Sequence, residues 1–226
     1  MPVSGMAKRR RWSLSKEEIL AAADALARRT SFDFSMRDLA ADLQTWPNSI
    51  YFFYENKRVL QAALLDQVLE RALMEETVAH FLDPSEPWQN RIRQLALSLF
   101  DQLSAYEGAG HMITHFGLTG SNAGLRLFQM YIHFGTSIGL TPERAATILQ
   151  VSFTLMVTLS DLAAAKRNGN ANPDLFKASG LPTHPDPGIQ AAAERILTNS
   201  VRDRAVAGID LFTRAIESEL QTSQQG

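Results

Sequence analysis

The sequence contains no cysteine. This absence excludes disulfide bonds, thiolate nucleophiles and cysteine-ligated zinc sites, and it fits a reducing cytoplasm. No stretch approaches the ~20 continuous apolar residues of a membrane span, and no apolar signal-peptide core follows the basic N-terminal residues. Strict alternation of apolar and polar residues, the pattern of a half-buried strand, is also missing. We therefore expect a soluble, cytoplasmic protein that has no membrane contact and is not built from strands.

Apolar residues recur at three- and four-residue steps through nearly the whole chain, which predicts an all-α protein. The net charge of −2 is distributed unevenly, because residues 1–60 carry +3 and residues 61–226 carry −5. A basic N-terminal part on an acidic body indicates two separate tasks, the first of which involves an anionic partner.

Start and stop signals divide the N-terminal part into short helices. Ser15 and Glu18 have the spacing of a capping box, and Ser35 is placed to cap a second helix. Pro47 predicts a break followed by a third helix that reaches about Tyr54. Asn56 can cap a fourth helix, which no glycine or proline interrupts before about residue 80.

Two short helices joined by a tight turn, between a first helix and a long exit helix, follow the helix-turn-helix plan. In that plan the second short helix enters the major groove of DNA. We expect Ile50, Phe53 and Tyr54 to face the domain core. The side chains on the opposite face would then meet the groove.

Helical patterns continue to the C-terminus. They cover about 88–106, 111–116, 122–138, 142–167 and 188–220, and the proline-rich stretch 168–187 is predicted to be a surface loop. We predict three parts: a basic flexible arm (1–14), a three-helix helix-turn-helix domain (15–61) and a larger helical ligand-binding and dimerisation domain (62–226).

The segments EEILAAADALARR, FSMRDLAADL and WPNSIYFFYENKRVL together resemble the DNA-binding domain of the TetR family of bacterial transcriptional regulators. The segments EPWQNRIRQLALSLFDQL and GLTPERAATILQVSFTLMVTL are similar to the tetracycline-repressor-like branch. The resemblance implies that Tyr51 and the residues around Pro47 approach DNA. It also implies that Lys57 contacts a phosphate.

Two positions depart from the family pattern. The turn between the second and third helices usually carries glycine and then an apolar residue, whereas this chain has Gln44 and Thr45, so a strained or differently shaped turn is expected. The paired histidines expected near the end of the fourth helix are replaced by LMEETVAHF. We therefore do not expect a tetracycline sensor.

The candidate DNA-binding residues fall into three groups. Basic or helix-terminal residues would contact phosphates, Asn48 and Ser49 would hydrogen-bond to base edges, and the aromatic residues would contact thymine methyl groups or sugars. Alternatively, the basic arm is only a solvated start, and Trp46 and Phe52 cover the domain core. Because the third helix lacks arginine, we expect modest sequence discrimination or an A/T-rich site. The full set is Lys8, Arg9, Arg10, Arg11, Ser35, Arg37, Trp46, Pro47, Asn48, Ser49, Tyr51, Phe52 and Lys57.

In the middle of the chain, Glu107, His111 and His115 follow one another at four-residue steps. Such spacing places three metal-ligand types on one helix face, but Gly108 and Gly110 interrupt the pattern, so we predict structural or pocket-lining histidines and no metal. Apolar residues with scattered polar groups suggest a small-molecule cavity, although the same spacing fills an ordinary core. The predicted ligand-binding residues are His111, His115, Phe116, Phe128, Tyr131, Phe134, Phe153 and Met156.

The last two long helices have more apolar residues than one subunit needs, which favours a dimer formed by two helices from each subunit. The alternative is burial within one subunit. The predicted dimerisation residues are Leu149, Phe153, Val157, Ile209, Phe212 and Ile216.

Taken together, the sequence predicts a homodimeric, sequence-specific DNA-binding transcriptional repressor that a small-molecule effector releases from a double-stranded operator. No nucleophile and base pair, catalytic metal motif or cofactor motif supports an enzyme. The alternatives are an all-α small-molecule carrier or enzyme, and a regulator that activates transcription or responds to no ligand.

Overall fold

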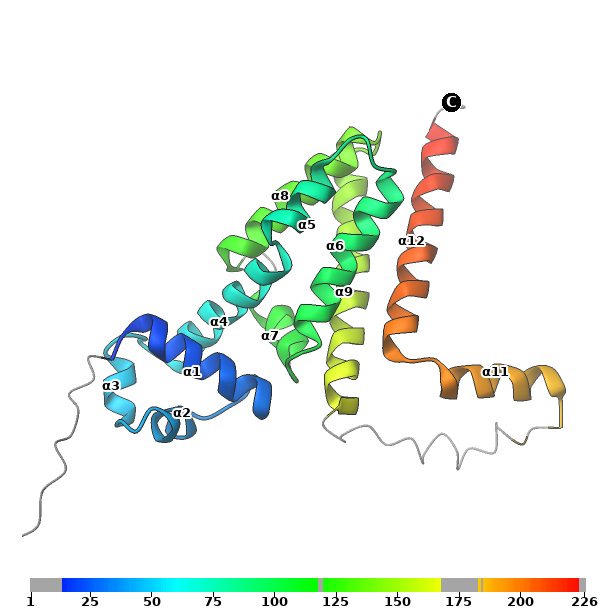
Figure 1. Ribbon diagram of the computed structural model, residues 1–226. Coiled ribbons are helices and arrows are strands. Elements are labelled where there is room, and N and C mark those ends of the chain that lie inside the picture. Colours follow the sequence, from blue (N-terminus) through cyan, green and yellow to red (C-terminus); the bar gives the residue numbers. More distant parts are fainter. Residues whose placement is uncertain (1–13, 118–119, 168–182, 184, 224–226) are drawn as a thin grey trace, which may run out of the picture.

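The computed structural model describes residues 14–117, 120–167, 183 and 185–223 (Figure 1). The predicted arm of residues 8–11 lies outside these residues, as does most of the predicted loop 168–187. Throughout the described ranges the regular structure is helical and contains no strand, which confirms the all-α prediction.

The N-terminal helices begin where side chains can bond the first free backbone N–H groups. Ser15 Oγ accepts from Glu18 N while Glu18 Oε2 accepts from Ser15 N, so the predicted capping box forms. Ser35 and Asn56 cap the second and fourth helices in the same way. The four helices are α1 (Lys16–Arg29), α2 (Met36–Asp42), α3 (Pro47–Tyr51) and α4 (Lys57–Ala72).

The predicted fourth helix does not continue to about residue 80. α4 ends at Ala72, and a separate helix α5 (Glu75–Leu82) follows after Leu73 and Met74. Two carbonyl groups freed by this break accept hydrogen bonds from side chains of other helices. Ser98 Oγ of α6 donates to Ala72 O (2.9 Å), and Arg126 Nη2 of α8 lies 3.5 Å from Leu73 O. The break therefore depends on tertiary contacts.

Six further helices complete the described fold. Several begin at capping residues that are visible in the sequence, such as Ser121 for α8 and Asp186 for α11. At the start of α8, Ala123 N also donates a hydrogen bond to the Asp66 carboxylate of α4 (2.8 Å). These helices are α6 (Trp88–Leu103), α7 (Ala109–Phe116), α8 (Asn122–Ser137), α9 (Pro142–Arg167), α11 (Pro187–Thr198) and α12 (Val201–Ser223).

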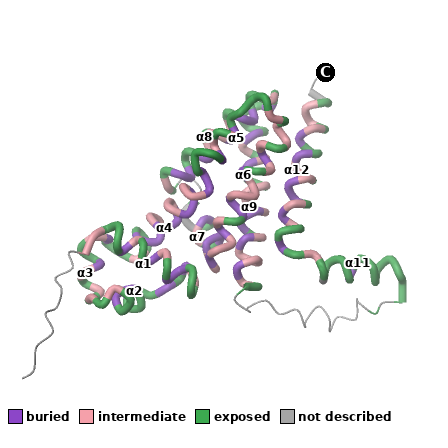
Figure 2. Tube along the Cα trace, in the orientation of Figure 1, coloured by how far each residue is buried: buried purple, intermediate pink, exposed green. Residues whose placement is uncertain are grey.

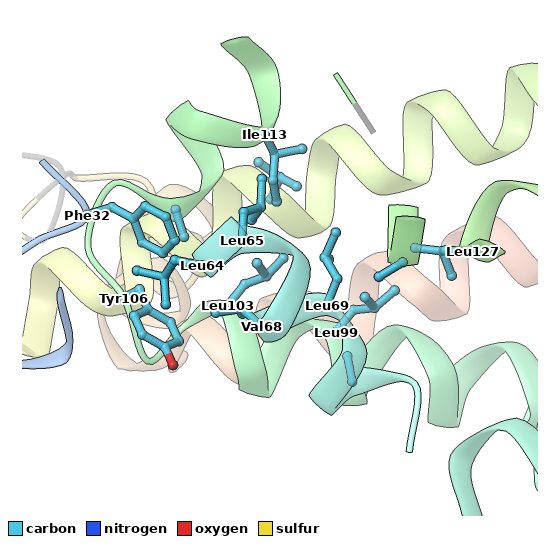
Figure 3. Close-up of a cluster of buried hydrophobic side chains, with 14 of the residues drawn as sticks. Phe32, Leu64, Leu65, Val68, Leu69, Leu99, Leu103, Tyr106, Ile113 and Leu127 are labelled. Carbon is cyan, nitrogen blue, oxygen red and sulfur yellow. The ribbon is translucent and has the colours of Figure 1, made fainter. Parts of the chain in front are cut away.

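One hydrophobic core runs from the N-terminal helices into the C-terminal body (Figures 2 and 3). Ile19 and Ile50 form its N-terminal end, and Leu64 and Val68 of α4 continue it towards Leu103 of α6. Because α4 is buried on sides that face both parts of the molecule, it belongs to both, and the two predicted helical domains share a core.

Helix α9 is long and apolar enough to span a membrane by length and composition alone. It packs against α6, α7, α8 and α12. The hydroxyl group of the buried Ser160 donates a hydrogen bond to Met156 O, one turn earlier in α9. Core helices of soluble proteins have the same composition. Only 28% of its most apolar window is buried within the chain, however, so part of its apolar surface is left uncovered.

Candidate DNA-binding face and effector cavity

The turn between α2 and α3 positions the candidate recognition helix. Gln44 is the only described non-glycine residue with a left-handed backbone, at a φ of 50°. Gln44 N donates to Ala41 O (3.0 Å) and Thr45 N donates to Ala40 O (2.9 Å), which are the two hydrogen bonds of a Schellman helix end. The turn therefore keeps the glycine-type geometry although glycine is absent, and the strain expected from the sequence is located at Gln44.

The outward face of α3 carries large uncovered side chains. Trp46 is 75% exposed, Phe52 is 85% exposed and Tyr51 is 43% exposed, while Asn48 is exposed beside them. Ile50 and Tyr54 are buried as predicted, and Phe53 is half-buried. The alternative that Trp46 and Phe52 cover the core is therefore wrong, since both side chains face solvent.

Charged and capping groups surround this face. Arg37 and Ser35 are exposed at the start of α2, and Ser35 Oγ bonds both Asp38 N and the Asp38 carboxylate. Lys57 is half-buried at the start of α4 and forms an ion pair with Asp33 of the α1–α2 loop. Lys57 thus lies where a phosphate contact is predicted, with a carboxylate as its present partner.

In the C-terminal body, a narrow apolar cavity of about 40 Å³ lies among α6, α8, α9 and α12. Three predicted ligand-binding residues, Tyr131, Phe153 and Met156, line it. Burial raises the pKa of Tyr131 and outweighs the opposing effect of its hydrogen bond with Ser152. None of the described residues that line the cavity has a charged side chain.

An open groove of about 450 Å³ lies beside the cavity, between α9 and the end of α7. Phe128 lines this groove, and Leu149 and Phe153 line both the groove and the cavity. Thr114, Gln150, Thr154 and Thr158 supply its polar groups, and none of its lining residues is charged.

The remaining predicted ligand residues lie elsewhere. Phe134 packs against Phe81, with ring centroids 4.8 Å apart, and does not line the cavity. His111 is exposed at the start of α7, and its backbone N–H donates to the Asp161 carboxylate (3.0 Å). Glu107 precedes α7, whose N-cap is Gly108, so the expected interruption separates Glu107 from the helix that carries His111. His115 and Phe116 end α7, but their side chains lie outside the described part of the structure.

Most of the predicted dimerisation residues contact the interior of their own subunit, and their part in a dimer stays a prediction. Leu149, Ile209 and Ile216 are buried and line the cavity together with the half-buried Phe153 and Phe212, while the buried Val157 lines the groove. The outward surfaces of α9 and α12 carry other side chains, including the exposed Val151 and Leu211.

A polar cluster that the sequence did not reveal joins the two parts of the molecule. Tyr106, fully buried after α6, donates its hydroxyl hydrogen to Asp24 of α1, and Arg71 of α4 bonds both groups, with its Nη2 2.9 Å from Asp24 Oδ1. Beside them Phe32 meets the Tyr106 ring edge-on at 5.6 Å and donates its backbone N–H to Glu107 O (2.8 Å). Figure 3 shows Phe32 and Tyr106 at one end of the shared core.

The electrostatics of this junction follow from its burial. Burial and the hydrogen bond to Asp24 raise the pKa of Tyr106 to about 12, so its hydroxyl stays protonated at neutral pH. Burial alone would raise the pKa of Asp24, but the hydrogen bonds from Tyr106 and Arg71 outweigh it and hold that pKa below its usual value. Asp24 is therefore an ionised anchor between helices α1 and α4.

No protein-family model and no curated protein matches the sequence. Several solved structures, in contrast, match the fold of this chain. Apo ActR from Streptomyces coelicolor superposes with a TM-score of 0.76 at 18% identity, and the match covers 93% of this chain and 98% of ActR. The chain has the TetR-family fold. A variant of TetR from Acinetobacter baumannii AYE, in complex with minocycline, shares this fold at a TM-score of 0.68 and 22% identity over 91% of this chain and 94% of its own.

A third structure with the TetR fold is BioQ with its double-stranded DNA operator. It matches with a TM-score of 0.57 at 19% identity and covers 76% of this chain and all of its own. ActR has also been solved with actinorhodin, at a TM-score of 0.71 and 20% identity over 92% of this chain and 98% of ActR. Proteins with the TetR fold have thus been captured with DNA and with small molecules.

Proposed function

We propose that this protein is a homodimeric transcriptional repressor that binds a specific DNA operator and is released by a small-molecule effector. The observation that carries the proposal is the outward face of α3. Trp46 and Phe52 are 75% and 85% exposed on a helix that a helix-turn-helix presents to the major groove. Large exposed aromatic side chains grouped on one short helix mark an interaction surface.

The contacts we propose on DNA divide into positioning and base recognition. Lys57, Arg37 and the arm of residues 8–11 contact phosphates, which makes affinity fall as salt rises. Asn48 and Ser49 hydrogen-bond to base edges, and Trp46, Tyr51 and Phe52 contact thymine methyl groups and sugars. Lys57 exchanges Asp33 for a phosphate when DNA binds.

A homodimer accounts for the uncovered apolar surface of α9. Exposed side chains that do not line the groove lie at positions 147 and 151 of α9 and at 207, 211, 215 and 218 of α12, with the three- and four-residue steps of a helix-packing stripe. Two copies joined through these stripes would place two α3 helices on successive turns of DNA, about 34–36 Å apart, on a palindromic operator.

The effector response needs a mechanical path from the cavity to α3. Leu95 and Leu99 of α6 line the cavity, and the chain after α6 carries Tyr106, which holds α1 and α4 through Asp24 and Arg71. An effector that displaces α6 would move α4, which acts as a lever on the DNA-binding helices. By linkage, DNA then weakens effector binding by the same factor.

Selection from a random duplex DNA library, followed by titration of the enriched sequence at two salt concentrations, tests the proposal. We expect a palindrome and a dimeric isotherm whose affinity falls steeply with salt. If no sequence is enriched and binding is no tighter than to random DNA, the protein is instead an all-α carrier or enzyme. An operator whose affinity is unchanged by every ligand shown to bind the protein would indicate a ligand-independent regulator.

A further inference from the structure

The cavity and the groove are separated by two side chains. Leu149 and Phe153, one turn apart on α9, line the cavity on one side and the groove on the other. Phe153 is only half-buried, and the groove beside it is open to solvent. A rotation of the Phe153 side chain towards the groove would join the two spaces into one site.

The cavity alone is too small for a drug-sized molecule. Its volume of about 40 Å³ has room for only a few water molecules, because each water needs roughly 10–15 Å³ of such space. The groove offers about 450 Å³. An effector larger than the cavity needs more space there, and displacement of Phe153 would let it occupy the cavity and part of the groove together.

The lining determines which chemistry this joined site accepts. In the cavity only Tyr131 and Ser152 carry side-chain polar atoms, and in the groove the polar groups are neutral hydroxyls and the amide of Gln150. A charged group placed there would lose its water without gaining an opposite charge, at a cost of several kcal/mol. A neutral, mainly apolar molecule loses little and can bond a polar group to Tyr131 or Ser152.

We propose that the effector is an uncharged, mainly apolar small molecule that binds in the joined cavity and groove after Phe153 moves. The effect on DNA rests on the function proposed above, whereas the binding site and its preference for neutral ligands do not. Entry of the ligand separates α6 from α9 and α12, the helices that enclose the cavity.

Two fluorescent probes with one skeleton test the charge preference directly. N-phenyl-1-naphthylamine is neutral, and 1-anilinonaphthalene-8-sulfonate is the same molecule with an added sulfonate. We expect the neutral probe to bind once per chain and at least about tenfold more tightly than the anionic one, a difference of about 1.4 kcal/mol. Equal or tighter binding of the anionic probe would overturn the proposal.

Two variants test the location. Ala96 lines the cavity, so Ala96→Leu fills the space and is expected to weaken the neutral probe at least about tenfold, whereas Ala192→Leu on the exposed surface of α11 should leave binding unchanged. Phe153→Ala removes the partition and is expected to tighten binding. Equal binding by the wild type and Ala96→Leu would contradict the location. If Ala96→Leu does not fold, Phe153→Ala tests the location instead, and the expected result is tighter binding of the neutral probe.

Operator binding is measured on the same samples without probe, so the two proposals fail separately. Operator binding without preference for the neutral probe overturns the ligand class and leaves the repressor in place. Preferential binding of the neutral probe by a protein with no operator leaves the site in place and overturns the repressor.

Discussion

Phe52 is the side chain whose exposure has the clearest functional consequence. Replacing it with alanine removes the apolar contact proposed to DNA and little buried surface, because 85% of Phe52 is already exposed. We expect Phe52→Ala to weaken operator binding by about 1–3 kcal/mol, roughly 5- to 150-fold, and to change the free energy of unfolding by less than about 0.5 kcal/mol. Fluorescence anisotropy and urea denaturation measure the two effects.

The control for this experiment is Leu82→Ala, since Leu82 is another exposed apolar residue but lies on α5, away from α3. It should leave operator affinity unchanged. If Phe52→Ala binds the operator as tightly as the wild type, the aromatic face does not contact DNA and the contacts proposed for α3 are wrong.

Asp24 should make stability depend on pH. Its pKa is lower in the folded than in the unfolded protein, so its contribution is fully present above the unfolded pKa of about 3.9 and is lost as pH falls through the folded value. We expect Asp24→Asn to lower the free energy of unfolding at neutral pH by about 1–3 kcal/mol. We also expect the free energy of unfolding of this variant to fall less steeply with decreasing pH than that of the wild type. Urea denaturation between about pH 6 and pH 3 measures both.

Asp42→Asn is the matched control, because Asp42 pairs with Arg29 at the surface, apart from Tyr106 and Arg71. Surface pairs contribute little, so this variant should follow the wild type within about 0.5 kcal/mol. An Asp24→Asn profile parallel to that of the wild type in acid would show that Asp24 is not the group that titrates.

At the scale of elements, the turn between α2 and α3 stores strain in Gln44. A non-glycine residue in the left-handed region costs about 1–2 kcal/mol. Glycine at position 44 would remove this strain, but the greater freedom of glycine in the unfolded chain offsets part of the gain in stability. We expect Gln44→Gly to raise the free energy of unfolding by about 0.5–1 kcal/mol. Gln44→Ala keeps the Cβ atom and should give no such gain. Equal stabilisation by both variants would show that backbone strain is not the cause.

Helix starts could be predicted from the sequence because their causes are local. Ser15, Ser35 and Asn56 each bond a backbone N–H within three residues, and the structure has helices where these caps predict them. The end of α4 could not be predicted, since the groups that stabilise it, Ser98 and Arg126, lie on distant helices. Local pattern therefore determined the starts and tertiary contacts determined this end.

The same distinction separates the two candidate sites. The outward face of α3 was predictable because Pro47 fixes where the helix begins and Ile50 marks its inner side. Helix α9 is apolar around much of its circumference, so its sequence does not show which face turns inward. For this reason the sequence alone does not reveal that Leu149 and Val157, predicted at a dimer interface, also line the subunit's own cavity and groove.

At the scale of the whole molecule, the exposed apolar surface of α9 and α12 predicts a dimer of twice 25.1 kDa. Leu211 is 63% exposed on α12, and a glutamate there would place a charge in the proposed interface. We expect Leu211→Glu to be a folded monomer in light scattering coupled to size exclusion. The control Leu125→Glu, on an exposed position of α8, should remain dimeric. A monomeric wild type would contradict the interface.

The core shared by the N-terminal helices and the C-terminal body also determines how the molecule melts. Because Phe32, Leu64 and Leu103 belong to one buried cluster, the DNA-binding helices cannot lose their packing without exposing the body, and calorimetry should record a single transition. A molecule bound in the cavity would then slow hydrogen exchange at the amides of α1 and α2, although it touches neither helix.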